Sequence, residues 1–312
     1  MQVNQDPAPA PIKARIAGPV SAVDWSKAEQ HEQACSWLQA VMDGRCAAEK
    51  CLPILMQGAA SHWPAREKWT LDWLEQHHGQ RMCKVRVAGS LKFTYTDAGL
   101  LKYYAFFKGK RRAPSVLVDM SLAEFVERSR PGCSLPSIVY PQGTEQYYLQ
   151  SGLTAGLKKD IDLRQRPFSI AADAGFGDKI GPTSSQVPRL WVSPRGAVSP
   201  LHFDASSSFL VQLQGQKRML FWPPSDLPGL YPYHNLHLLR RRARVDPANP
   251  DYKRFPRFRD TAAYEAIVEP GDVMFFPSCW AHYTESLDQS VSVTCRFGAT
   301  EYHESVRPGF LW

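Results

Sequence analysis

The stretch Ser199-Pro200-Leu201-His202-Phe203-Asp204 decides how the second half of the chain is expected to fold. His202 and Asp204 stand two residues apart, so on a β-strand both side chains project from the same face and can share one metal ion. Such a pair arises by chance in many sequences, so a third ligand must come from elsewhere. Two imidazoles and one carboxylate on a single face would suit a redox-active ferrous ion, because they leave positions open for a chelating cosubstrate and dioxygen.

His282 is the best candidate for the third ligand. It lies downstream of Glu269-Pro270-Gly271-Asp272-Val273-Met274-Phe275-Phe276-Pro277, a turn followed by an apolar strand that would carry the chain back across a barrel. The separation between Asp204 and His282 leaves room for several intervening strands. The three residues are therefore expected to meet at the mouth of a barrel.

The segments around these ligands are typical of β-structure. Beyond Arg189, short apolar or alternating runs are punctuated by Gly and Pro, which favours a mainly β barrel or jelly roll. Strands are predicted over residues 189–193, 200–204, 208–214, 217–222, 265–268, 272–276, 281–286 and 290–297. The polar insertion over residues 223–264 is expected to be functional, for example a lid over the mouth, with a disordered loop as the alternative.

The first half of the chain is expected to flank this barrel with helices. Helices are predicted over residues 26–42, 70–79 and 121–129, and a short buried strand over residues 52–56. Thr70 is the expected N-cap of the second helix, and Ser121 with Glu124 forms the capping box of the third. Three segments are expected: a flexible Pro-rich arm over residues 1–24, a supporting α/β region over residues 25–185, and the barrel core over residues 186–312.

Composition excludes several classes of protein. The chain has 312 residues, 44% of them apolar and 21% charged, as in folded globular proteins. The first 18 residues lack the apolar core of a secretion signal, and no run reaches the ~18–20 apolar residues of a membrane helix. The seven cysteines form no C-x-x-C pair, so neither a disulfide framework nor a zinc ribbon is expected. A cytoplasmic protein without membrane contact follows, with a nuclear location open in a eukaryote.

The formal net charge is +7, with basic runs at Lys108, Lys110, Arg111 and Arg112 and at Arg240, Arg241, Arg242 and Arg244. Such runs can attract an acidic peptide or a nucleic acid. Neither run is interleaved with the stacking aromatic residues of a single-strand binding surface, so both are expected to be solvated loop segments.

Several motifs together resemble one family. They are Ser199 to Asp204, Gln214-Gly215-Gln216-Lys217-Arg218, Phe221-Trp222-Pro223-Pro224, Asn249-Pro250-Asp251-Tyr252, Arg254-Phe255-Pro256, and Pro270-Gly271-Asp272 to His282. Weaker features upstream are Trp63-Pro64 and Tyr147-Tyr148-Leu149-Gln150. This pattern resembles the JmjC subgroup of cupin-fold oxygenases, in particular its small hydroxylases such as factor inhibiting HIF and the tRNA wybutosine hydroxylase. The resemblance implies a double-stranded β-helix that uses Fe(II), 2-oxoglutarate and dioxygen.

The resemblance also assigns a cosubstrate pocket beside the metal ligands His202, Asp204 and His282. Lys217 would bind the distal carboxylate of 2-oxoglutarate, and a buried ammonium without a carboxylate partner does need a counter-ion. Ser199 and Tyr148 match the family's hydroxyl-bearing positions in the same pocket.

Two positions depart from the family's pattern, because relatives often carry Asn where this chain has Ser208 and Arg296. Both departures touch the predicted cosubstrate pocket. Arg296 lies fourteen residues after His282 and could grip a carboxylate in bidentate fashion, which makes it a rival of Lys217. We favour Lys217, because its local sequence matches the subgroup.

The reaction expected from the resemblance is hydroxylation of a protein or peptide side chain, with release of succinate and CO2. Hydroxylation of RNA, such as a tRNA nucleoside, is an alternative that the basic runs favour, and histone lysine demethylation is another, although no methylammonium cage is recognisable. A metal-free cupin that only binds a partner is the non-enzymatic alternative, and the intact set of three ligands argues against it. The oligomeric state is left open.

Overall fold

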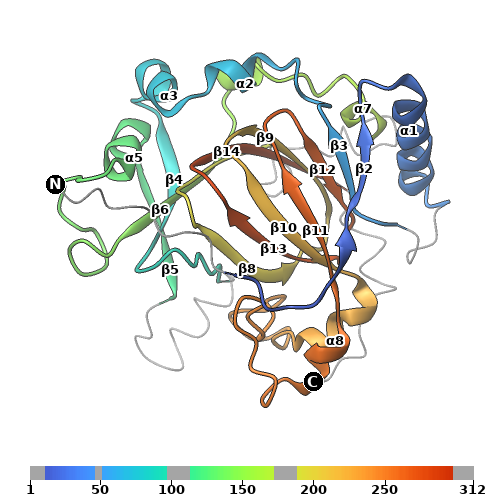
Figure 1. Cartoon of the computed structure of the whole chain (residues 1–312). Coiled ribbons are helices and arrows are strands. Elements are labelled where there is room, and N and C mark those ends of the chain that lie inside the picture. Colours follow the sequence, from blue (N-terminus) through green and yellow to red (C-terminus); the bar gives the residue numbers. More distant parts are fainter. Residues whose placement is uncertain (1–10, 46–50, 97–112, 172–187, 298–312) are drawn as a thin grey trace.

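The computed structural model describes residues 11–45, 51–96, 113–171 and 188–297. Within them, strands form two sheets that face one another (Figure 1). The small sheet has the order β1-β11-β10-β13-β8, with β1 Ile16–Pro19, β11 Ala263–Val268, β10 Lys217–Trp222, β13 Ala281–Ser286 and β8 Val198–Phe203. The large sheet has the order β2-β3-β12-β9-β14-β7-β6-β4-β5. Its strands are β2 Ser21–Asp24, β3 Ile54–Gln57, β12 Val273–Phe276, β9 Ser207–Gln214, β14 Ser290–Phe297, β7 Arg189–Ser193, β6 Gln146–Gly152, β4 Met82–Ala88 and β5 Ser115–Ser121.

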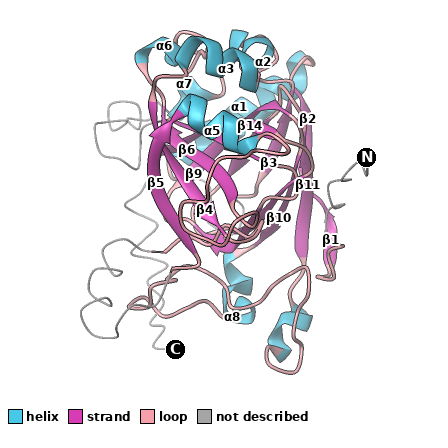
Figure 2. Ribbon diagram, turned by 90° about the vertical axis from the view of Figure 1, so that its left-hand side faces the viewer, coloured by secondary structure: helices cyan, strands magenta, loops and turns pink. Residues whose placement is uncertain are grey.

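Helices cover the outer face of the large sheet (Figure 2). They are α1 Ala28–Met42, α2 Pro64–Lys68, α3 Leu71–His78, α5 Leu122–Ser129, α6 Ala155–Lys158 and α7 Phe168–Ala171. The largest apolar cluster joins helix residues such as Leu38, Leu74 and Phe125 to the outward side chains of β9 and β14. A further apolar cluster lies between the sheets and includes Leu210, Met219 and Phe276. The predicted mainly β, jelly-roll cupin architecture is confirmed.

The insertion over residues 223–264 contains three short helices and the start of β11. The helices are η3 Pro224–Asp226, α8 Leu227–Leu230 and η4 Pro256–Asp260. A second apolar cluster holds the insertion against the outer face of the small sheet, where Leu230 and Phe258 pack with Trp222. The insertion is thus fastened to the barrel in the part of the chain that the structure describes.

The N-terminal segment differs from the sequence prediction. Residues 16–24 form β1 and β2 instead of a flexible arm, while residues 1–10 lie outside the described part. β1 pairs in parallel with β11, and β2 pairs in parallel with β3. Each strand has only four residues, most of them exposed, so no alternating pattern marks them. Their hydrogen-bond partners come from remote segments, which a local pattern cannot reveal.

The large sheet also crosses the predicted boundary at residue 185. β6 from the first half of the chain pairs with β7 from the second, and β4 and β5 extend the sheet further. The first half therefore supplies part of the inner face as well as the covering helices.

No helix among the described residues is both long and apolar enough to cross a membrane.

Candidate metal and cosubstrate site

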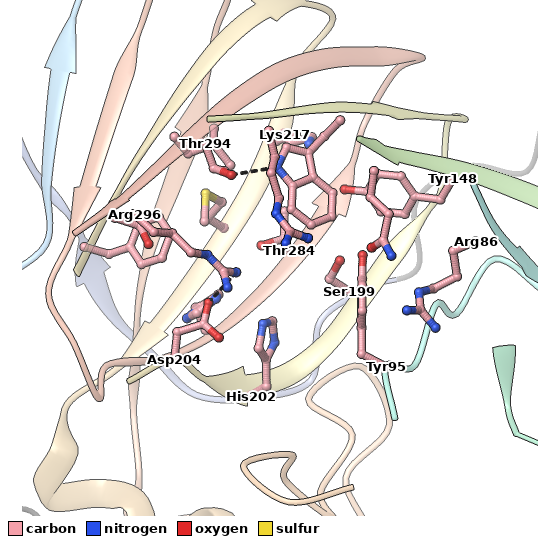
Figure 3. Close-up of a pocket in the computed structure, with 18 of the residues that line it drawn as sticks. Arg86, Tyr95, Tyr148, Ser199, His202, Asp204, Lys217, Thr284, Thr294 and Arg296 are labelled. Carbon is pink, nitrogen blue, oxygen red and sulfur yellow. Dashed lines mark hydrogen bonds and ion pairs between the residues drawn. The ribbon is translucent and has the colours of Figure 1, made fainter. Parts of the chain in front are cut away.

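A cavity of about 660 Å³ lies between the two sheets (Figure 3). Its walls come from both sheets and from the insertion. All eight site residues predicted from the sequence line it: Tyr148, Ser199, His202, Asp204, Ser208, Lys217, His282 and Arg296. Residues far apart in the chain are therefore brought together around one cavity.

The alternation of side chains along β14 shows how the strands separate the core from the cavity. Thr294 and Arg296 line the cavity, whereas Val293 and Cys295 belong to the apolar cluster behind the sheet. Successive side chains on a strand point to opposite faces, so one strand can line the cavity and pack into the apolar core at the same time.

The three predicted metal ligands converge at one end of the cavity. His202 on β8 stands directly opposite His282 on β13 in the antiparallel register, and their ring centroids are 4.2 Å apart. Asp204 follows immediately after β8. One ligand atom from each of the three residues lies within 4.8 Å of the others. Two histidines and a carboxylate at this separation fit a single metal ion with open coordination positions.

A β-bulge in β8 aligns the first ligand with Ser199. Thr284 is opposite Ser199 and His282 is opposite His202, so three residues of β8 span two on β13. The extra residue allows Ser199 and His202 to face the same cavity although they are three apart. Pro200 lies within this bulge on the edge strand of the small sheet, where the missing N–H costs no ladder hydrogen bond.

Both imidazoles are oriented by their own backbone. Nδ1 of His202 donates to the carbonyl oxygen of Pro200 at 2.8 Å, and Nδ1 of His282 donates to that of Trp280 at 3.0 Å. Burial lowers the pKa of His202 well below its usual value and lowers that of His282 as well, so both rings are neutral at neutral pH. A neutral ring with a protonated Nδ1 presents the lone pair of Nε2. The two Nε2 atoms are therefore available to a metal.

Asp204 is paired with Arg296. Their closest nitrogen–oxygen distance, from a guanidinium nitrogen to Oδ2, is 2.7 Å, but the approach is not aligned as a hydrogen bond. Burial would raise the pKa of Asp204, but Arg296, the two histidines and Arg242 together outweigh burial, and the pKa falls below its usual value. The carboxylate is thus ionised, and Oδ1 remains for a metal. Since Arg296 is already engaged with Asp204, this contact favours Lys217 over Arg296 as the cosubstrate anchor.

Lys217 is buried to an unusual degree for a lysine, with 1% of its surface exposed. Its Nζ donates to Oγ of Ser292 at 2.8 Å and lies 5.9 Å from the ring centroid of Tyr148. No carboxylate of the described residues lies within ion-pair distance of it. Burial lowers its pKa to about 7. An ammonium in this position is costly unless an anion accompanies it.

The remaining predicted residues border Lys217 and the ligands. Tyr148 is buried, and burial raises the pKa of its hydroxyl. The Oγ of Ser208 is buried and has no hydrogen-bond partner among the described residues, so it has capacity for a ligand. These groups, together with the ammonium of Lys217, fit a dicarboxylate cosubstrate. The donor set of the histidines and Asp204 likewise fits Fe(II).

Several residues that line the cavity were not predicted as site residues, among them Arg86, Tyr95, Arg189, Arg241 and Arg242. The run from Arg240 to Arg244 was expected to be a solvated loop segment, but two of its arginines face the cavity. The reason is a bridge between His202 and Arg242, which fastens the insertion to β8. The other basic run, at Lys108 to Arg112, lies outside the described residues. The alternation of Arg86 between Val85 and Val87 was the signal that could have indicated an inward-facing arginine.

Comparison with known proteins agrees with this geometry. The model of a cupin-like domain matches residues 40–300. Lysine-specific demethylase 8 of Xenopus tropicalis is 29% identical over 245 residues, covering 78% of this chain and 47% of the relative. Jumonji C domain-containing protein 5 of Drosophila melanogaster is 28% identical over 243 residues, covering 78% of this chain and 53% of the relative.

A third relative, HSPB1-associated protein 1 of Homo sapiens, is 37% identical over 138 residues, covering 42% of this chain and 27% of the relative. The chain spans about half the length of the first two relatives. The resemblance indicated by the sequence motifs is confirmed. The chain belongs to the cupin-like domain family, and it is similar to relatives named for a Jumonji C domain or for lysine demethylation.

Proposed function

We propose that this chain is an oxygenase that hydroxylates a side chain of a protein or peptide, converting 2-oxoglutarate to succinate and CO2. One observation carries the proposal: His202, Asp204 and His282 share a cavity with the buried ammonium of Lys217. An open metal site beside an uncompensated buried cation is the arrangement that a metal-chelating dicarboxylate requires. A cupin that merely binds a partner has no need of either feature.

Each residue has a distinct part in this proposal. Nε2 of His202, Nε2 of His282 and Oδ1 of Asp204 would hold the iron, which supplies the activation of dioxygen when it is bound. Lys217, with Ser199 and Tyr148 nearby, would bind the far carboxylate of 2-oxoglutarate and so fix its orientation. Arg296 holds Asp204 in its ionised form. Phe276 and Met219 contribute apolar wall that limits access of water.

A protein side chain as the substrate has two alternatives, a methylated lysine and an RNA. The names of the relatives suggest demethylation of lysine as an alternative reaction. However, several arginines line the cavity, and they would repel a methylammonium cation. Hydroxylation of RNA is supported by positive charge alone, that of the whole chain and that of the cavity arginines. The relatives' names favour a protein substrate. Free thiols are found at Cys35, Cys83, Cys133, Cys279 and Cys295, most of them buried, which favours a cytoplasmic or nuclear location.

The test is to remove the metal ligands one at a time. His202→Ala and Asp204→Ala should each abolish Fe(II) binding and reduce succinate formation by at least about 100-fold, because an open three-ligand site does not tolerate the loss of one ligand. Anaerobic titration with Fe(II) and 2-oxoglutarate, followed by the visible absorption of the chelate, measures binding, and circular dichroism confirms folding. His77→Ala, which removes an exposed histidine on α3, is the matched control. Wild-type succinate formation in either ligand variant would contradict the proposal.

A further inference from the structure

The cavity carries far more positive than negative charge. Seven cationic side chains line it, whereas Asp204 is the only carboxylate among the described residues that do so. Bound Fe(II) and 2-oxoglutarate would cancel one another, and Asp204 would offset Arg296. Lys84 is paired with Asp119, but Arg86, Arg241 and Arg242 have no carboxylate partner among the described residues and would still leave the loaded cavity positive. An enclosed space with this balance attracts an anionic group.

Arg86 is one of two arginines suited to bind that group. It lies on β4 in a position opposite Tyr148 and is 6% exposed. Its Nη1 donates to Oγ of Ser115 at 3.0 Å, and its guanidinium carbon lies 4.1 Å from the ring centroid of Tyr95. Nε of Arg86 is buried without a hydrogen-bond partner among the described residues. A guanidinium nine-tenths buried with an unused donor is an incomplete site for an anion.

Arg242 approaches the same aromatic ring from the insertion. Its guanidinium carbon lies 5.6 Å from the ring centroid of Tyr95. Its carbonyl oxygen accepts from the N–H of Tyr233 at 2.9 Å, and the bridge to His202 fixes its backbone beside the metal ligands. Burial lowers the pKa of Arg242 to about 10, so the guanidinium remains charged at neutral pH. No carboxylate of the described residues is within ion-pair distance of Arg86 or Arg242.

The backbone at the neighbouring residue supports a functional role for this loop. Arg241 has a left-handed conformation, with φ of 64°. A residue other than glycine adopts this region at a cost, and such residues concentrate at functional sites. The N–H of Phe203 donates to the carbonyl oxygen of Arg241 at 3.1 Å, so the strained turn is held against β8. The turn thereby brings Arg242 to the cavity.

We propose that Arg86 and Arg242, both lying against Tyr95, bind an anionic side chain of the substrate, so that the enzyme acts on an acidic segment of a protein. This inference rests on the proposed function and names its substrate class. The planar guanidinium groups can each offer two parallel hydrogen bonds to a carboxylate or to a phosphate. In Figure 3, Arg86 and Tyr95 lie to one side of His202, and Asp204 and Arg296 to the other. In this view Arg86 therefore lies away from the contact between Asp204 and Arg296.

The experiment measures peptide binding to the full chain loaded anaerobically with Fe(II) and 2-oxoglutarate, so that no turnover intervenes. The probes are fluorescent glycine- and serine-based peptides whose central residue is Asp, Asn, phosphoserine or trimethyllysine, together with a single-stranded RNA oligonucleotide. Fluorescence anisotropy gives each affinity. The Asp and Asn peptides differ in charge but hardly in shape, so their ratio isolates the effect of the anion.

The Asp peptide is expected to bind at least about tenfold more tightly than the Asn peptide. A hydrogen bond between two charged groups in a cavity contributes enough binding free energy for a tenfold change in affinity. Arg242→Gln should abolish the preference. Arg244→Gln removes the same charge from the same run but at an exposed position, and should retain it. Tighter binding of the phosphoserine peptide than of the Asp peptide would identify a phosphate as the preferred anion at the same pair.

Three results would overturn the inference: equal binding of the Asp and Asn peptides, tighter binding of trimethyllysine or RNA than of either acidic peptide, or an Asp preference that survives in Arg242→Gln. Arg242 is only partly buried and lies on a loop, so its variant keeps the test valid even if Arg86→Gln fails to fold. Succinate formation without peptide is measured separately. If succinate forms while the preference is absent, only this inference fails; if neither Fe(II) binding nor succinate is detected, the proposed function fails.

Discussion

Lys217 and Arg296 are the two cations that compete for the role of cosubstrate anchor, and their contacts differ. Among the described residues, the ammonium of Lys217 bonds to a hydroxyl alone, whereas Arg296 is already paired with Asp204. Lys217→Ala should therefore raise the 2-oxoglutarate concentration needed for half-maximal succinate formation by about 10- to 100-fold. Arg296→Ala should change this concentration less and weaken Fe(II) binding instead. A larger effect of Arg296→Ala on 2-oxoglutarate would move the anchor to β14.

The pKa of Lys217 predicts how cosubstrate binding depends on pH. Burial lowers this pKa from 10.5 to about 7, so at pH 8 the ligand-free protein holds Lys217 largely neutral. A bound carboxylate favours the ammonium, so binding at pH 8 should take up close to one proton, and affinity should fall by up to about tenfold per pH unit above pH 7. Calorimetry in two buffers of different ionisation enthalpy measures the uptake. Lys217→Met should eliminate it, and binding without proton uptake in the wild type would refute the assignment.

The same lowered pKa affects the stability of the ligand-free protein. Between pH 7 and 10.5 the unfolded chain holds a proton on Lys217 that the folded chain does not. Stability therefore rises with pH through this window, because the unfolded state binds more protons. At lower pH both states are protonated and the full burial cost is present.

Individual site residues could be predicted from the sequence where they lie within a recognisable motif. His202, Asp204, His282 and Lys217 each lie in a stretch with recognisable neighbours, and all of them line the cavity. Arg242 could not be predicted in this way, because its position depends on a bridge between the insertion and β8. A basic run in sequence gives no information about which of its members is buried.

Among the secondary-structure elements, the turn between β9 and β10 depends on Gly215 and leads directly to Lys217. Its φ is +65°, and a Cβ there would lie 2.2 Å from the carbonyl oxygen of Gln289. Gly132 has a similar φ of +76° but open space around it. Gly132→Ala should therefore cost only the left-handed strain, about 1–2 kcal/mol. Gly215→Ala should cost roughly 1–3 kcal/mol more, because backbone must move to relieve the clash.

Denaturant unfolding of the two alanine variants measures this difference. Equal losses of stability would show that the turn at Gly215 can relax without displacing its neighbours. Gly215→Ala should in addition weaken 2-oxoglutarate binding, because Lys217 begins the following strand. Gly132→Ala should leave that binding unchanged.

Elements were predictable where the signal is local. The caps of α3 and α5 are confirmed, since the Thr70 side chain accepts from the N–H of Trp73 and the Ser121 side chain from that of Glu124. The strands at 189–193, 217–222, 281–286 and 290–297 have the predicted bounds. β4, β5 and β6 were not predicted as strands. They lie outside the Gly- and Pro-punctuated part of the chain, and their place depends on pairing with β7.

At the scale of the whole molecule, β1 and β2 join the N-terminus to both sheets. The N–H of Val20 donates to the carbonyl oxygen of Glu265 at 2.8 Å, and Val20 is buried between strands. Removal of residues 1–24 should lower the melting temperature by several degrees, since each kcal/mol corresponds to about 2–4 °C in large domains. Differential scanning calorimetry measures the change. An unchanged melting temperature would mean that β1 and β2 contribute nothing to stability.

The division of the cavity between two sheets has a consequence for how such proteins diverge. The histidines that we propose bind the metal belong to β8 and β13 of the small sheet, while Arg86 belongs to the large sheet and Arg242 to the insertion. Substitutions on β4 or in the insertion can alter which molecules are accepted without touching the groups that hold iron. A lineage can thus acquire new targets while inheriting one chemistry. A chimera that takes these two segments from a relative would be expected to keep its iron site and exchange its choice of target.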